Sequence, residues 1–154
     1  MKHTGTAIAA FALFASATAA TACDQYDAVV GAVQKDDAKT AAALYEEVIV
    51  SAACDDALRE WVGDFLARDT FLAAMQPEID ADAKQELLRT ALGYERHWRT
   101  YNELGLIAWQ DEDFTTAAEN FQLALNELTD GDQSHAAASF EIAALYDYAW
   151  QSLS

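Results

Sequence analysis

Apolar side chains recur at spacings of three and four residues between Phe114 and Leu128. This period matches the α-helix, so the pattern predicts one helix with a single apolar face. The rest of the chain suits the same conformation, because it holds only 6 Gly and 1 Pro and few runs of β-branched residues. We therefore expect an all-α protein. The apolar face consists of Phe114, Ala117, Ala118, Phe121, Ala124, Leu125 and Leu128.

The segment before this helix extends the pattern into a two-helix motif. A first helix would carry Leu104, Gly105 and Ala108, and a second would carry the apolar face, with small residues where the two helices approach. On these residues the segment 98–131 resembles a tetratricopeptide repeat, a helix pair that recurs about every 34 residues. It departs from the family at Glu112, where Gly is preferred, and at Thr129, where Pro is preferred. The matching residues are Leu104, Gly105, Ala108, Phe114, Ala117, Phe121, Ala124 and Leu125.

Neighbouring segments fit the same plan less closely. Residues 55–94 are predicted to be helical but irregular, with helices near 55–67 and 69–76, a break at Pro77, and a helix near 80–94. Residues 132–151 predict a C-terminal capping helix. The resemblance implies a short right-handed stack of antiparallel helical hairpins, an α-solenoid, over residues 23–154. Residues 33–49 resemble the turn and second helix of another repeat, through Ala38, Ala41, Tyr45 and Val48.

Residues 1–22 have the pattern of a secretory signal peptide. Lys2 and His3 precede an apolar run at 7–17, and Ala20-Thr21-Ala22 then supplies the small residues that signal peptidase recognises. The run is shorter than the roughly 20 residues that a permanent membrane span requires. We expect this segment to be cleaved and the protein to be exported to the periplasm; an uncleaved anchor is the alternative.

Two interpretations of the first of the 2 cysteines stay open. If residues 24–36 and 38–52 form antiparallel helices, Cys23 and Cys54 return to the same end and can form a disulfide, a bond that persists in exported proteins. Alternatively, the sequence around Cys23 resembles a lipoprotein signal, which would make the protein lipid-anchored in the envelope. Ala20 stands where such signals usually carry Leu.

Charge and motif content limit the classes of function. With 26 acidic and 9 basic residues, the chain carries a net charge of −17, and such a field repels nucleic acid and anionic membrane surfaces. We expect membrane association only if Cys23 is lipidated. His97 and His135 lack a second ligand at metal spacing, and no phosphate-binding loop or nucleophile motif is present. We therefore expect no enzyme, no metal and no cofactor.

The remaining candidate is a binding surface. Lys84, Arg89, Arg96 and Arg99 lie among aromatic residues, either as a clamp for a carboxylate or peptide, or as a helix junction in which they pair with nearby acids. The resemblance implies a ligand groove lined by the first helix of each pair. We expect an interaction or scaffold module for a protein or peptide partner, with an envelope lipoprotein spacer or an envelope hydrolase as alternatives. Carried over, the groove positions are Arg99, Asn102, Leu106, Trp109, Gln110 and Phe140.

Overall fold

The computed structural model describes residues 23, 25–50, 54–128 and 136–153. Over these residues the chain forms α-helices and no strand, so the all-α prediction is confirmed. The expected signal peptide at 1–22 and residues 129–135 lie outside the described residues. The helices are α1 (Tyr26–Gln34), α2 (Ala38–Val50), α3 (Asp56–Ala74), α4 (Ala81–Tyr94), α5 (Trp98–Gln110), α6 (Phe114–Leu128) and α7 (Ala136–Ser152).

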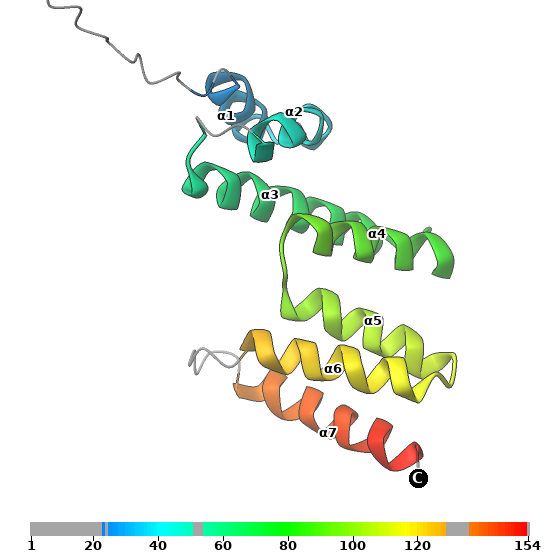
Figure 1. The fold of residues 1–154 in the computed structure, drawn as a ribbon. Coiled ribbons are helices and arrows are strands. Elements are labelled where there is room, and N and C mark those ends of the chain that lie inside the picture. The colour runs from blue at the N-terminus through cyan, green and yellow to red at the C-terminus, as the bar shows by residue number, and fades with distance from the viewer. Residues whose placement is uncertain (1–22, 24, 51–53, 129–135, 154) are drawn as a thin grey trace, which may run out of the picture.

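Consecutive helices lie beside one another in a row that runs the length of the molecule (Figure 1), from α1 and α2 at one end to α7 at the other. Each helix packs on the next one in the sequence. Short turns join α1 to α2 and α5 to α6, so these pairs run antiparallel. No helix in the described part of the chain is both long enough and apolar enough to cross a membrane.

The turns of these two pairs have the same construction. Asp36 and Glu112 both adopt positive φ, at 58° and 60°, the left-handed conformation that commonly ends helices. The following residues then begin the next helix: the Asp37 carboxylate accepts a hydrogen bond from the Thr40 backbone N–H, and the Asp113 carboxylate accepts one from Thr116. These hydrogen bonds lower the pKa of both carboxyls. Glu112 thus takes the conformation for which the family prefers glycine.

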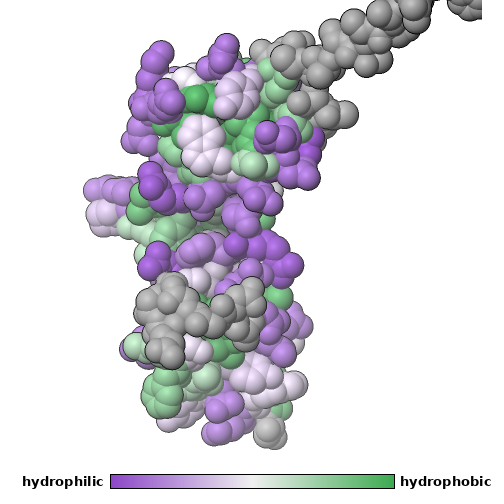
Figure 2. Space-filling model, turned by 90° about the vertical axis from the view of Figure 1, so that its left-hand side faces the viewer, coloured by the Kyte–Doolittle hydropathy of each residue, from purple (hydrophilic) through white to green (hydrophobic). Residues whose placement is uncertain are grey.

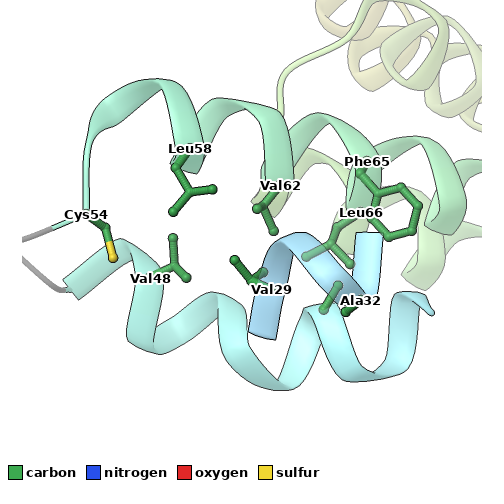
Figure 3. Close-up of a cluster of buried hydrophobic side chains, with 9 residues drawn as sticks. Val29, Ala32, Val48, Cys54, Leu58, Val62, Phe65 and Leu66 are labelled. Carbon is green, nitrogen blue, oxygen red and sulfur yellow. The ribbon is translucent and has the colours of Figure 1, made fainter. Parts of the chain in front are cut away.

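The apolar side chains form a series of separate clusters rather than one core. The first lies between α1, α2 and α3, where Val29, Val48 and Val62 point toward one another (Figure 3) and are completely buried. The second joins α3, α4 and α5 through Ala74, Leu88 and Leu104. The third lies between α5, α6 and α7 and consists of Tyr101, Ala108, Ala117, Ala118, Phe121, Ala124, Ile142 and Ala149.

Close packing in the third cluster explains the Leu104-Gly105 motif. A Cβ atom at Gly105 would lie 2.6 Å from the ring of Phe121, which is fully buried. Phe121 therefore needs a glycine opposite it, and α5 and α6 approach closely at this point. The antiparallel helix pair predicted for this segment is present.

One predicted element is wrong. The sequence was expected to form two helices near 55–67 and 69–76, but the structure has the single helix α3. No glycine or proline lies between the two predicted segments, and Leu66, Ala67 and Ala74 are buried along the continuous helix. The break at Pro77 is present, and α4 then begins after Asp80, whose carboxylate accepts a hydrogen bond from the Ala83 backbone N–H.

The first cluster is closed by a disulfide. Cys23 and Cys54 are bonded to each other, with their Cα atoms 4.8 Å apart, and Cys54 is buried against α1–α3. The disulfide uses the same sulfur that a lipid anchor would need, so the two alternatives for Cys23 exclude each other. The predicted pairing is present.

Candidate functional site

Three of the predicted groove residues on α5 border a surface hollow. It has a volume of about 360 Å³ and lies between α5 and α7, with Phe71 of α3 at one side. Its walls are mostly apolar. The lining residues are Phe71, Trp98, Arg99, Asn102, Glu103, Leu106, Ala138, Glu141, Ile142 and Leu145.

The structure brings together three of the six predicted groove residues: Arg99, Asn102 and Leu106. Trp109 lies elsewhere, in the seam of α5, α6 and α7, where its ring centroid is 5.6 Å from that of Phe114 and 6.3 Å from that of Tyr148. Gln110 is the exposed last residue of α5. Phe140 projects from α7 with 78% of its surface exposed, and it does not line the hollow.

Sequence reasoning missed much of the wall of this hollow. Ile142 and Leu145 belong to the apolar face of the predicted capping helix, so the sequence contained a signal for them. Phe71 had none, because it was assigned to a separate short helix. Its position depends on the full length of α3, which carries it to the start of α5.

Asn102 has an unmet hydrogen-bonding requirement. Its Oδ1 atom is buried and, among the described residues, has no hydrogen-bond donor. Buried polar atoms in folded proteins are nearly always paired, and an unpaired one costs roughly 1–3 kcal/mol. Because Oδ1 has almost no accessible surface, a ligand in the hollow would reach it only after the Asn102 side chain moves.

The four basic residues of the cluster have different places: Lys84 and Arg96 connect elements, Arg99 lines the hollow, and Arg89 is exposed on α4 away from it. Lys84 pairs with Glu103 at 2.8 Å and so joins α4 to α5, and Arg96 pairs with Glu127 at 3.1 Å. The guanidinium of Arg99 instead lies 4.9 Å from the ring centroid of its neighbour Trp98 and, within the described part of the chain, makes no ion pair. The junction interpretation therefore applies to Lys84 and Arg96.

Three further hollows continue from the first toward the N-terminal end. The next one, about 140 Å³, shares Phe71 and Arg99 with it. A third, about 220 Å³, shares Asp64 and Arg68 with the second. The fourth, about 320 Å³, shares Trp61 with the third.

We call this row of four hollows the furrow. The described residues that line it come from α1, α3, α5 and α7 and from the segments that flank them, and none comes from α2, α4 or α6. The furrow therefore follows the first helix of each successive pair.

The 140 Å³ hollow contains the most polar part of the furrow. Asp64, Arg68 and Glu95 line it, together with His97, whose Nδ1 accepts a hydrogen bond from the Arg99 backbone N–H at the start of α5. Burial raises the pKa of the Glu95 carboxyl, and the negative charge of Asp64 raises it further. The volume is below the roughly 300–1,000 Å³ of typical small-molecule sites.

In comparisons with known proteins, no family model, curated protein or solved structure matches this chain. The resemblance to tetratricopeptide repeats therefore rests on the motif residues alone.

Proposed function

We propose that this protein is an exported interaction module that holds an extended polypeptide segment of a partner protein in the furrow. The observation that carries the proposal is the series of four hollows that share lining residues from α1 to α7. A short right-handed stack of tetratricopeptide-like hairpins would present the first helix of each pair along one continuous surface. An elongated furrow of this kind suits an extended chain better than a compact ligand.

The chemistry of the furrow near α5 and α7 supports a polypeptide ligand. Leu106, Ile142 and Leu145 offer an apolar wall, and Asn102 is a polar residue in the same lining. Arg99 adds a positive charge that is available for a carboxylate of the partner.

Two observations support export. Disulfides such as Cys23–Cys54 persist in oxidising compartments and are rare in the cytosol. The net charge of −17 suits a protein that stays in solution outside the cell. The intact mass of the protein from the periplasm tests this part: we expect a chain that begins at or near Cys23 and has lost two hydrogens, and the mass of an added lipid would support the lipoprotein alternative.

An envelope hydrolase is the second candidate, favoured by the presence of Asp64, Glu95 and His97 around one hollow. Hydrolysis by paired carboxyls needs room for a substrate between them, and this hollow of about 140 Å³ provides little. We therefore prefer binding to catalysis.

Site-specific photocrosslinking in cells tests the groove. A photoreactive amino acid placed at position 106, in place of Leu106, lies in the furrow. The same photoreactive amino acid in place of Glu119 lies on the exposed side of α6. We expect one partner to be crosslinked from Leu106 and not from Glu119. The crosslink should disappear in an Arg99→Glu background, with the helical circular dichroism unchanged. Equal crosslinking from both positions would contradict the proposal.

A further inference from the structure

A pair of exposed aromatic side chains borders the N-terminal hollow of the furrow. Tyr26 on α1 and Trp61 on α3 line it with 49% and 43% of their surfaces exposed. Between them lie Val30, Ala57 and Leu58. Figure 2 shows that the end of the molecule formed by α1–α3 carries pale and green side chains surrounded by hydrophilic ones.

Among the described residues, neither aromatic ring has a ring or cation–π partner. Neither Tyr26 nor Trp61 makes a ring contact or a cation–π contact with another described residue. By contrast, Tyr45 and Trp109 have ring partners. Two large aromatic surfaces that face one hollow and meet no ring of their own chain are available to a ligand.

The charges around these rings favour a cation. Asp55 lines the hollow itself, and on the other side of Trp61 the adjoining hollow carries Asp36 and Asp64, opposed by Arg68. Arg59, the basic residue nearest to Trp61 in sequence, is turned away: it pairs with Asp56 and donates from Nε to the Val48 carbonyl on α2. The faces of aromatic rings also attract positive charge.

We infer that the Tyr26–Trp61 hollow is a subsite for an arginine or lysine side chain of the partner segment. The aliphatic stem would pack against Val30 and Leu58, and the charged end would lie between the two rings near Asp55. This inference rests on the proposed function in one respect, that the occupant is a polypeptide bound along the furrow. It adds the chemistry that selects the segment at this end.

Peptide binding to the full-length, disulfide-bonded protein tests the subsite. The probe is an acetylated and amidated octapeptide of alternating alanine and arginine, and its control replaces arginine with citrulline, which has nearly the same shape and no charge. In titrations followed by nuclear magnetic resonance, we expect the indole N–H signal of Trp61 to shift with the arginine peptide and the signal of Trp150 to stay in place. Similar shifts with the citrulline peptide would overturn the inference.

Matched variants separate this subsite from general attraction to an acidic protein. Trp61→Ala and Tyr26→Ala should each weaken binding of the arginine peptide by roughly fivefold, and Trp61→Phe should retain most of the affinity. Trp150→Ala removes an equally large side chain, 56% exposed on α7 at the other end of the molecule, and should leave the affinity unchanged. Equal affinities of wild type, Trp61→Ala and Trp150→Ala would show unspecific charge attraction and reject the subsite.

Failure of the subsite and failure of the proposed function have different signatures. If Trp61→Ala has no effect on the arginine peptide while the crosslink from Leu106 persists, the subsite is rejected and the groove stands. If the arginine peptide depends on Trp61 while the crosslink from Leu106 is absent, the subsite stands and the rest of the groove is rejected.

Discussion

At the scale of single residues, the contact between Gly105 and Phe121 decides how closely α5 and α6 approach. Glycine is normally a poor helix residue, because it costs about 1 kcal/mol relative to alanine in a helix interior. Here the preference is reversed, since an added Cβ would lie 2.6 Å from a ring that is fully buried. Neither helix backbone nor ring can move away without opening the cluster around them.

Gly105→Ala should therefore lower the free energy of unfolding by about 1–3 kcal/mol, the usual cost of overpacking a core. Gly31→Ala is the matched control, because nothing lies within 4 Å of a Cβ at that helical position. It should raise stability by up to about 1 kcal/mol. Urea denaturation followed by circular dichroism measures both values. An increase in stability for Gly105→Ala would show that the two helices are not held in this contact.

Residue patterns predicted the α5–α6 pair, and three of the six predicted groove residues, Arg99, Asn102 and Leu106, line the hollow between α5 and α7. Leu104, Gly105 and Phe121 were among the motif residues that predicted the pair, because their spacing places them on one side of each helix. The close contact between Gly105 and Phe121 itself was not predicted. The exposure of Phe140 and the position of the half-buried Trp109 between α5, α6 and α7 were not predictable in this way. They depend on how α7 lies across α5 and α6, and the sequence pattern contains no information on that angle.

At the scale of elements, the disulfide is expected to contribute more to the stability of α1 and α2 than any single interaction contributes to the later helices. α1 is the shortest helix described, with 9 residues, and a helix of this length is unstable by itself in water. Its buried residues are Val29 and Ala32, both small. The Cys23–Cys54 bond ties the chain just before α1 to the segment just before α3, where Cys54 lies two residues ahead of the helix.

Cys54→Ser should lower the free energy of unfolding by roughly 2–5 kcal/mol, the usual range for loss of a native disulfide. The loss should be local, because Cys54 packs only within the cluster of α1–α3. Hydrogen exchange should therefore speed up most in α1 and α2 and least in α5 and α6. Wild-type protein treated with reductant is the control and should behave in the same way. Uniform loss of protection along the chain would contradict this view.

The error in α3 has a physical cause at this scale. The predicted boundary fell at Arg68, a residue that by itself neither ends a helix nor marks its continuation. The structure keeps the helix continuous because Leu66, Ala67 and Ala74 are buried further along its length. Tertiary packing here overrides a weak local signal, and the same packing brings Phe71 into the furrow.

At the scale of the whole molecule, stability is distributed over three clusters in series. The middle one is the smallest, with Ala74, Leu88 and Leu104 as its buried members. Two ion pairs also cross this region. Lys84–Glu103 joins α4 to α5, and Arg96–Glu127 joins the segment between α4 and α5 to α6. Ion pairs near the surface contribute little, about 0–1 kcal/mol each. We therefore expect the middle cluster to couple the unfolding of the two ends.

Leu88→Ala should uncouple the two ends. The side chain is completely buried, so its truncation should lower the free energy of unfolding by about 2–5 kcal/mol. The loss weakens the packing of α4 against α3 and α5. In a linear array, the coupling between neighbours determines cooperativity. We expect calorimetry to resolve one transition for the wild type and two for Leu88→Ala, with α1–α4 and α5–α7 exchanging hydrogen at different rates.

The control for this prediction is Leu72→Ala, the same change at a leucine that is 52% exposed on α3, and it should leave the single transition intact. If Leu88→Ala only lowers the melting temperature and keeps one transition, the two ends are coupled through contacts other than the middle cluster.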